Sequence, residues 1–158
     1  MVLDKLPEFR EALRLLTQES VFVGIPEKTD GRKDGDPIGN AGIGFVQENG
    51  SPAQNIPPRP FLVPGVAAVQ DQLADELQAG ADAVLVGRFD AVRTSYNRAG
   101  ILAVNSVRAT ITAGEGFDPL SKRTLAARAR RGVSRTKPLI DTGQLRASVT
   151  YVVRKRGA

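Results

Sequence analysis

The chain has 158 residues, 41% of them hydrophobic and 25% charged, with a formal net charge of +5. These proportions are typical of a globular protein with room for one core, and an aromatic content of only 5% argues against a surface that stacks single-stranded bases. The chain contains no cysteine and no histidine. It therefore has no disulfide or thiolate chemistry, and it lacks the commonest general base and transition-metal ligand.

Basic residues are concentrated in the last quarter of the chain. Residues 119–158 contain eleven of the 22 basic residues and one acidic residue, Asp141, which gives this segment a net charge of +10. The rest of the chain has eleven basic and sixteen acidic residues, a net charge of −5. This polarity indicates that the basic segment faces either nucleic acid or the acidic surface of a neighbouring subunit.

The N-terminal region predicts a helix, a strand and a loop. Apolar residues three and four apart predict a helix over residues 3–18, with Asp4 as N-cap and Pro7 in its first turn, packed on a sheet through one apolar stripe. The β-branched and aromatic run of residues 20–26 predicts a strand buried on both faces. Residues 28–36 predict a mobile polar loop; the order of its aspartates does not match a calcium-binding loop, so no metal site is expected there.

A short helix is predicted before the proline-rich region. Asp36 is a candidate N-cap, Pro37 suits the first helical position, and Gly50 suits the residue that ends the helix. The glycines inside this element weaken the prediction and leave a strand over residues 43–47 as an alternative. They also suit close contact between backbones.

A long helical region follows. Apolar spacing over residues 66–112 predicts one long helix or two helices in tandem. We expect the helix to break or kink at Gly80, and near Gly100 if anywhere else. Gly114 suits the residue that ends the region.

Between these helical parts, residues 49–62 predict an extended proline-rich arm. Prolines 57, 58 and 60 lack an amide donor, and each biases the preceding residue towards an extended backbone, so residues 55–60 should form a stiff rod that is neither helix nor central strand. Such a rod needs other contacts to hold it in place. An ion pair between Glu48 and Arg59 could provide one, and a contact of Arg59 with a neighbouring subunit is the alternative.

The basic segment predicts a short helix and a strand. Ser121 or Thr124 is expected to cap a basic helix that ends near Gly132, and residues 144–154 alternate in the manner of a half-buried strand. This strand should pair with the strand at 20–26 or with the sheet of a neighbouring subunit. Together the elements predict an α+β fold, a small antiparallel sheet packed with helices, in a single domain over residues 1–158.

No motif in the sequence predicts catalysis. The carboxylates of Glu48, Asp90, Glu115 and Asp141 have no recognisable acid/base partner, and no phosphate-binding fingerprint follows a predicted strand. We therefore expect neither an enzyme nor a bound cofactor or metal. The N-terminus lacks the pattern of a signal peptide and no window approaches about 20 apolar residues, so we expect a protein made and kept in the cytosol or released by lysis, without a membrane partner.

Several stretches, in order, resemble a known family. Residues 38–50 begin with IGNA and end with VQENG, and residues 56–62 read IPPRPFL. Residues 119–125 read PLSKRTL, and residues 137–149 read KPLIDTGQLRASV. Together they resemble the virion morphogenesis proteins of tailed phages, which act in tail completion and in the neck, including those of Mu-like phages.

This resemblance implies a non-enzymatic component of the virion. Such a subunit would assemble into a ring, with a hexamer favoured, at the head–tail junction, where it completes or terminates the tail and lets DNA pass. Its partners would be other neck and tail-tube proteins, with transient contact with DNA, and it would reside in the virion after assembly in the host cytoplasm. The candidate subunit-interface residues are Glu48, Arg59, Pro60, Phe61, Leu145 and Tyr151.

A second hypothesis is a cytosolic module that binds nucleic acid through the basic segment. The five arginines below are candidates for either an exposed DNA-facing surface or contact with an acidic partner, such as the face of another copy that carries Asp71, Asp75 and Glu76. A solvated surface is the simpler alternative. These arginines are Arg123, Arg128, Arg130, Arg131 and Arg135.

Overall fold

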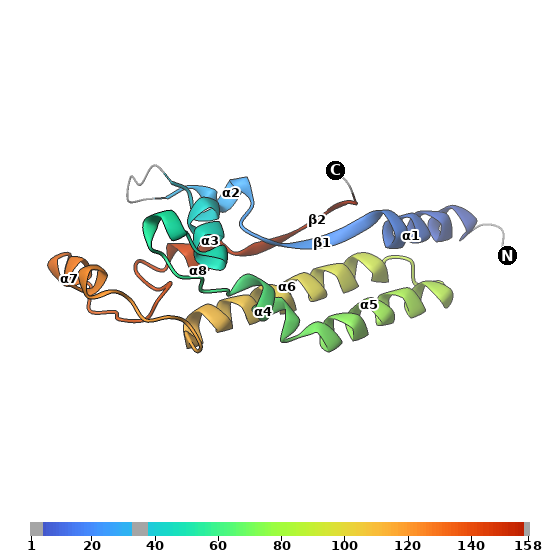
Figure 1. Cartoon of the computed structure of the whole chain (residues 1–158). Helices are drawn as coiled ribbons and strands as arrows, with labels where there is room; N and C mark the ends of the chain where they lie inside the picture. The colour runs from blue at the N-terminus through green and yellow to red at the C-terminus, as the bar shows by residue number, and fades with distance from the viewer. Residues whose placement is uncertain (1–4, 33–37, 157–158) are drawn as a thin grey trace.

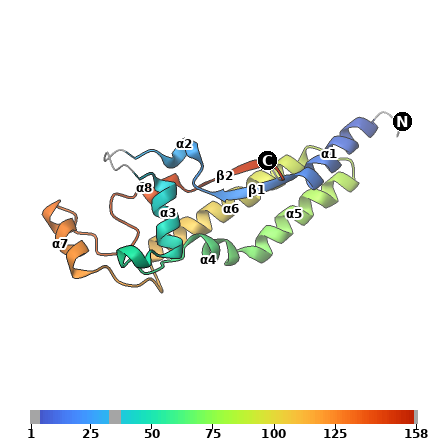
Figure 2. The same cartoon turned by 45° about the horizontal axis from the view of Figure 1, so that its top comes forward.

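The computed structural model of the chain describes residues 5–32 and 38–156. Within these residues the chain forms eight α-helices, a short 3-10 helix and one antiparallel pair of strands, so the predicted α+β class is confirmed. The molecule is elongated, with α7 (Lys122–Arg130) at one end and α1 (Leu6–Gln18) at the other (Figures 1 and 2). Among the helices that the structure describes, none combines the length and the apolar character that a membrane crossing requires.

The central element of the fold is a pair of adjacent helices, α5 (Gln70–Leu85) and α6 (Ala91–Ala113), which run side by side in opposite directions (Figure 1). The turn between them contains Gly87, whose φ of 83° is a left-handed conformation that glycine adopts readily. The prediction of helices in tandem over residues 66–112 is confirmed, but the break lies at residues 86–90.

The predicted breaks at Gly80 and Gly100 are wrong, because each glycine allows close packing within an unbroken helix. A side-chain carbon at Gly80 would collide with Ser95 on the facing helix. A side-chain carbon at Gly100 would collide with the ring of Tyr151, which packs against α6 at this point. The absence of a side chain at Gly80 therefore allows α5 to approach α6 closely, and its absence at Gly100 allows Tyr151 of β2 to pack directly on α6.

The sheet pairs β1 (Glu19–Gly24) with β2 (Thr150–Lys155), with Val21 opposite Val153. The predicted N-terminal strand and its C-terminal partner are both confirmed. Burial on both faces is wrong, because α6 contacts the sheet and no described element covers its other side, where Phe22 remains 47% exposed.

The predicted strand over residues 144–154 is wrong in its first half, where the chain forms α8 (Gln144–Ser148). Gly143, with a φ of 85°, leads into this helix. Leu145 and Val149 are four residues apart, a spacing that places two side chains on one face of a helix as readily as on one face of a strand. Both side chains are buried in the core, and the helical turn places them on the same side of the chain, facing it.

The core consists of two clusters that share α6. One joins the proline segment to α6 and α8, and contains Phe61, Val104, Val107, Ile111, Leu145 and Val149. The other joins α1 to α5 and α6, and contains Ala12, Leu15, Val84, Val92 and Tyr96. The predicted first helix is thus confirmed, with Pro7 in its first turn, although it packs on α5 and α6 as well as on β1. The predicted N-cap Asp4 is wrong, because the helix begins at Leu6 and its N-cap is Lys5, which makes no side-chain capping hydrogen bond.

Between β1 and the proline segment lie α2 (Glu27–Asp30) and α3 (Asn40–Asn49). The predicted start of the second of these helices is wrong: Asp36 and Pro37 lie outside the described residues, but the helix begins at Asn40 with Gly39 as its N-cap. Its predicted end is confirmed, since Gly50 follows α3 with a φ of 77°. The alternative of a strand over residues 43–47 is wrong.

Two polar residues join α2 to α3. Asp30 accepts a hydrogen bond of 2.6 Å from the backbone amide of Ala41 in the first turn of α3. Asn40, which is 2% exposed, donates from its side-chain amide towards the carbonyl groups of residues 29–31. The prediction of a mobile loop over residues 28–36 is therefore wrong for its first residues, which belong to α2 and are hydrogen-bonded to α3. Residues 33–36 lie outside the described residues.

Candidate functional site

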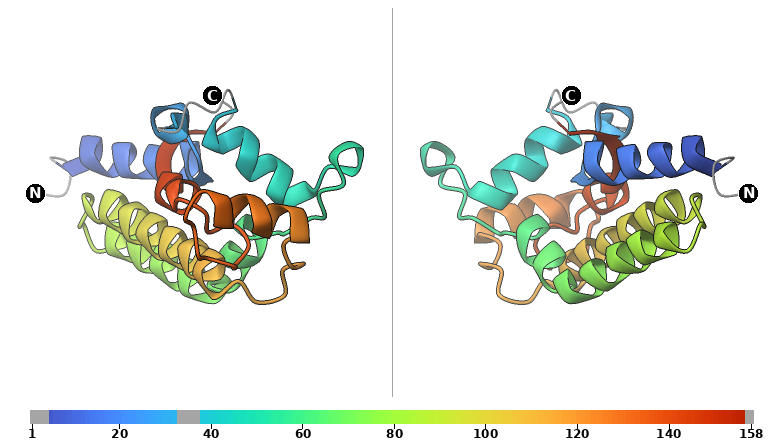
Figure 3. Two further views of the ribbon diagram at one scale, coloured as in Figure 1. Left: turned by 90° about the vertical axis from the view of Figure 1, so that its left-hand side faces the viewer. Right: turned by 90° about the vertical axis from the view of Figure 1, so that its right-hand side faces the viewer.

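The proline segment begins with a closed loop. Residues 51–56, which include η2 (Pro52–Gln54), are closed by two backbone hydrogen bonds of 2.8 and 3.0 Å between the first and last of them. This loop projects from the end of α3, on the side of the molecule away from α1 (Figure 3). The predicted extended arm over residues 49–62 is therefore wrong in its first half, and the rod predicted within it is wrong at its first residue, Asn55, which has a φ of 52°. Residues 57–61 contain neither helix nor strand, as predicted.

The carboxylate of Glu48 caps the helix that follows the prolines, α4 (Leu62–Ala67). It accepts hydrogen bonds from the backbone amides of Phe61, Leu62 and Val63, at 2.7, 2.8 and 3.0 Å. These amides are among those that a helix leaves without partners at its positive end. The prediction of an ion pair between Glu48 and Arg59 is therefore wrong, because the carboxylate holds the end of the segment through backbone amides.

Arg59 lies between Pro58 and Pro60, and its side chain is turned inwards, with 6% exposed. Its guanidinium donates to the carbonyl groups of Asp118 and Pro119, at 2.7 and 3.1 Å, and to Oε1 of Gln47, at 3.1 Å. Its backbone amide donates to the carbonyl of Gln47 at 2.6 Å. One arginine thus joins α3, the proline segment and the loop before α7.

Burial lowers the pKa of the Arg59 guanidinium, and the charge of Asp118 opposes this shift. An arginine remains protonated over any ordinary pH range even when its pKa is lowered. Arg59 therefore acts here as a fixed donor of several hydrogen bonds.

The basic helix α7 begins at Ser121, whose hydroxyl accepts a 3.1 Å hydrogen bond from the amide of Thr124, so this predicted cap is confirmed. The predicted exposure of Arg128 is wrong, since this side chain is 5% exposed. Its Nη1 donates to the carbonyl groups of residues 135, 137 and 140, at 2.9, 2.9 and 3.1 Å. Arg128 therefore fixes the chain that follows α7 against the helix.

Asp141 is the acidic partner of this basic region. Its carboxylate lies 2.7 Å from Nη2 of Arg131 and 3.8 Å from Nε of Arg128, and its carbonyl accepts from Arg135 at 2.8 Å. Of the five arginines predicted to form a basic surface, three are thus employed within the subunit. Arg123 and Arg130 remain exposed on α7.

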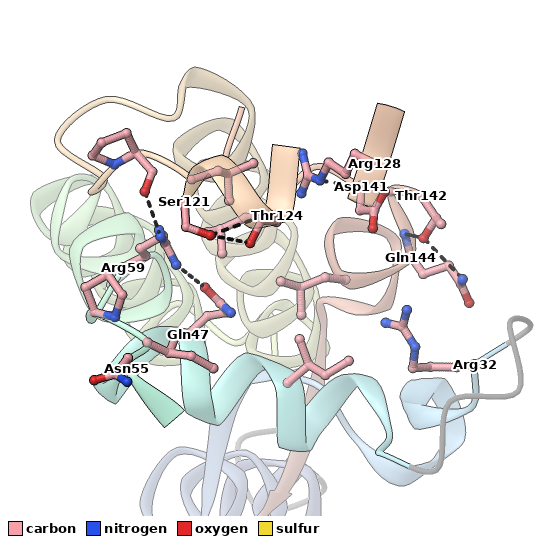
Figure 4. Close-up of a pocket in the computed structure, with 18 residues that line it drawn as sticks. Arg32, Gln47, Asn55, Arg59, Ser121, Thr124, Arg128, Asp141, Thr142 and Gln144 are labelled. Carbon is pink, nitrogen blue, oxygen red and sulfur yellow. Dashed lines mark hydrogen bonds and ion pairs between the residues drawn. The ribbon is translucent and has the colours of Figure 1, made fainter. Parts of the chain in front are cut away.

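A groove of about 520 Å³, lined by both polar and apolar side chains, lies between α3, the proline segment, α7 and the turn before α8 (Figure 4). Gln47, Arg59, Thr124, Asp141 and Gln144 are among the side chains that line it. Among the described residues that line the groove, the one carboxylate is that of Asp141, which is paired with Arg131. In the described part of the chain, no group of three metal-ligating side chains occurs. The groove is a junction that holds four segments in one arrangement.

The six predicted interface residues lie in two settings. Phe61, Leu145 and Tyr151 meet around the first core cluster, where Tyr151 is partly buried and its hydroxyl is 3.2 Å from Asn97 Oδ1. Glu48 and Arg59 hold the proline segment as described above, and Pro60 is exposed. Five of the six thus contribute contacts inside the subunit, and Pro60 remains available at its surface.

Two residues of this junction were not predicted from the sequence. Lys137 donates from Nζ to the carbonyl groups of Thr112 and Ala113, at 3.1 and 3.2 Å, where α6 ends. Gln47 accepts from Arg59. A lysine that donates to the last carbonyl groups of a helix is a familiar stabilising contact. Here Lys137 is 25 residues from Thr112 and 24 from Ala113, so their spacing in the sequence gave no indication of the contact.

The fold and the groove define an α+β protein whose polar side chains join segments distant in sequence. Comparison of the chain with protein-family models, with curated proteins and with solved structures finds no match.

Replacing Arg128 with alanine is expected to loosen the α7 region while leaving the helical core folded. Loss of three hydrogen bonds from a charged donor should lower the local opening free energy of residues 122–140 by about 2–3 kcal/mol. Hydrogen exchange followed by mass spectrometry measures this. Arg123→Ala, an exposed change in the same helix, is the control. Equal protection of residues 122–140 in both variants would contradict the role assigned to Arg128.

Proposed function

We propose that this chain is a structural virion protein of a tailed phage, a ring-forming subunit of the neck that completes or terminates the tail at the head–tail junction and surrounds the DNA channel. The observation that carries the proposal is the meeting of the stretches that resemble the family. Residues 56–62 and 119–145 are far apart in sequence, yet the guanidinium of Arg59 joins them directly.

The way this junction is built supports a structural role. Its arginines and carboxylates hold backbone groups, a use that produces a fixed shape. Residues 57–60 of the proline segment have few accessible conformations because three of these four residues are prolines. A subunit that must fit identical neighbours around an axis benefits from such rigidity, since less conformational entropy is lost on assembly.

The elongated shape also supports assembly. The basic α7 lies at one end of the long axis, and the acidic α5 runs from the middle of the molecule towards the other end (Figures 1 and 2). A surface at one end that fits a different surface at the other end generates rings when the rotation between copies closes.

Size-exclusion chromatography with light scattering, together with negative-stain electron microscopy, tests the proposal. We expect a closed ring, with a hexamer favoured, either from the purified chain or on isolated tail tubes. A chain that stays monomeric at high concentration and does not assemble on tail tubes would contradict the proposed function.

A second candidate function is a module that binds nucleic acid. It is favoured by the exposed Lys122, Arg123 and Arg130 on α7, a helix that contains no acidic residue. This hypothesis predicts micromolar affinity of the purified chain for duplex DNA and a steep loss of affinity with salt. Fluorescence anisotropy at low salt measures it, and an absence of binding there would eliminate this candidate.

A further inference from the structure

Helix α5 carries one exposed stripe of carboxylates. The helix contains four acidic residues and no basic residue. Asp71, Asp75 and Asp82 are separated by four and seven positions, which places them within about 40° of one another around the helix and along about 16 Å of its length. All three are exposed, and none forms an ion pair with another described residue. We call these three residues the acidic stripe.

Helix α7 carries the opposite charge on its outer side. Lys122, Arg123 and Arg130 are exposed and fall on one side of the helix, within about 100° and along about 12 Å. Arg128 points the other way, into the subunit. Among the described residues, none of the three exposed cations forms an ion pair. We call these three residues the basic face.

The acidic stripe and the basic face do not meet within one copy. Figures 1 and 2 both place α7 at one end of the long axis, whereas α5 runs from the middle of the molecule towards the other end. Each surface is a single helix side of similar length carrying three charges of one sign. Exposed Ala126 lies between the cations of the basic face, and its short side chain lets another helix approach closely.

We propose that the basic face of one copy docks on the acidic stripe of a second copy, so that subunits join head to tail. This inference rests on the proposed ring-forming function and assigns the surfaces that would form the ring. A second copy accounts for both surfaces at once, whereas DNA would account only for the basic face. The proposed contact does not involve Arg59 or Arg128, which line the groove between α3 and α7 and join segments within the subunit.

The test uses two full-length variants in which the charges are reversed. The stripe variant carries Asp71→Lys, Asp75→Lys and Asp82→Lys. The face variant carries Lys122→Glu, Arg123→Glu and Arg130→Glu. We expect each variant alone to self-associate about 30-fold more weakly than the natural chain, because three attractive pairs become repulsive. Sedimentation velocity over a range of concentrations measures this.

Mixing the two variants provides the decisive measurement. In the mixture, the lysines on α5 of the stripe variant can contact the glutamates on α7 of the face variant. The unchanged α7 of the stripe variant is basic and can contact the unchanged, acidic α5 of the face variant. An equimolar mixture should therefore recover the assembly of the natural chain. All of these positions are exposed, and circular dichroism checks that each variant is folded. Raising the salt concentration should weaken the natural contact and the restored contact alike.

The outcomes separate this inference from the proposed function. If the natural chain forms rings and both reversed variants form them equally well, the assigned surfaces are wrong and the ring-forming function stands. If the natural chain and the mixture both stay monomeric, with and without tail tubes, both proposals are overturned. If the face variant loses DNA affinity and mixing restores no assembly, the basic face binds DNA and the docking inference is overturned.

A cross-link provides an independent measurement of the same contact. The chain contains no cysteine, so Gln78→Cys, between Asp75 and Asp82 on the same side of α5, together with Ala126→Cys, between Arg123 and Arg130 on α7, introduces the only thiols. Oxidation should produce a ladder of covalently joined copies. The matched control places the second thiol at Ala53, an exposed residue of η2. A ladder of equal yield from both double variants would overturn the assigned contact.

Discussion

Replacing Arg59 with alanine is expected to lower the free energy of unfolding by about 3–5 kcal/mol, because a buried side chain and several of its hydrogen bonds are lost together. The carbonyl groups of Asp118 and Pro119 and the side chain of Gln47 would each lose their donor. Phe61, two residues along, is 2% exposed and packs in the first core cluster, so loosening of the proline segment should reach the core. Urea denaturation followed by circular dichroism measures the change.

Lysine at position 59 distinguishes charge from geometry. A lysine keeps the positive charge but presents one ammonium group, which cannot reproduce the planar arrangement by which arginine reaches three acceptors. We therefore expect Arg59→Lys to recover less than half of the lost stability. Arg123→Ala, which changes an exposed arginine of α7, is the control and should alter stability by about 0.5 kcal/mol or less. If Arg59→Ala destabilises the chain no more than this control, Arg59 does not hold the junction.

Replacing Glu48 with alanine is expected to lower the free energy of unfolding by about 2–4 kcal/mol. The three amides that Glu48 binds lie at the first turn of α4, and each would lose a charged acceptor. Glutamine at this position keeps one carbonyl oxygen but no charge, so Glu48→Gln should show about half of the loss. Thermal and urea denaturation of both variants measure the effect.

The control for Glu48 is Glu115→Ala, which removes an exposed carboxylate from the loop after α6. Its effect on stability should be small, since exposed carboxylates contribute little. Equal stability of Glu48→Ala and Glu115→Ala would show that the cap on α4 contributes nothing. A further check is hydrogen exchange at Leu62 and Val63, whose amides should lose protection first in Glu48→Ala.

Carboxylates outside a helix cap two consecutive helices of this chain. Asp30 of α2 accepts from the first turn of α3, and Glu48 of α3 accepts from the first turn of α4. Neither helix receives a side-chain hydrogen bond from its own N-cap residue, Gly39 or Phe61. Each helix start is thereby tied to the preceding element, which fixes the angles between short segments that have little core of their own.

The sequence by itself determined the elements whose signals are local. Apolar spacing predicted α1 and the helical region that contains α5 and α6, since side chains three and four apart share one helix side. Ser121 was predicted as a cap from its hydroxyl and its position before a helix, and Gly50 and Gly114 as helix ends from their tolerance of positive φ. The α+β class followed from these elements and from the two strand patterns.

Only the tertiary structure decided which polar groups form hydrogen bonds with one another. It also decided which secondary structure forms where the residue pattern fits both a helix and a strand. Arg59 binds carbonyl groups 59 and 60 residues away, and Arg128 turns inwards although its neighbours in sequence are basic and exposed. The helix α8, which contacts α6 and buries Leu145, was likewise decided by packing. A hydrogen bond depends on positions in space, and burial can favour either of two local conformations, so neither can be read from residue order alone.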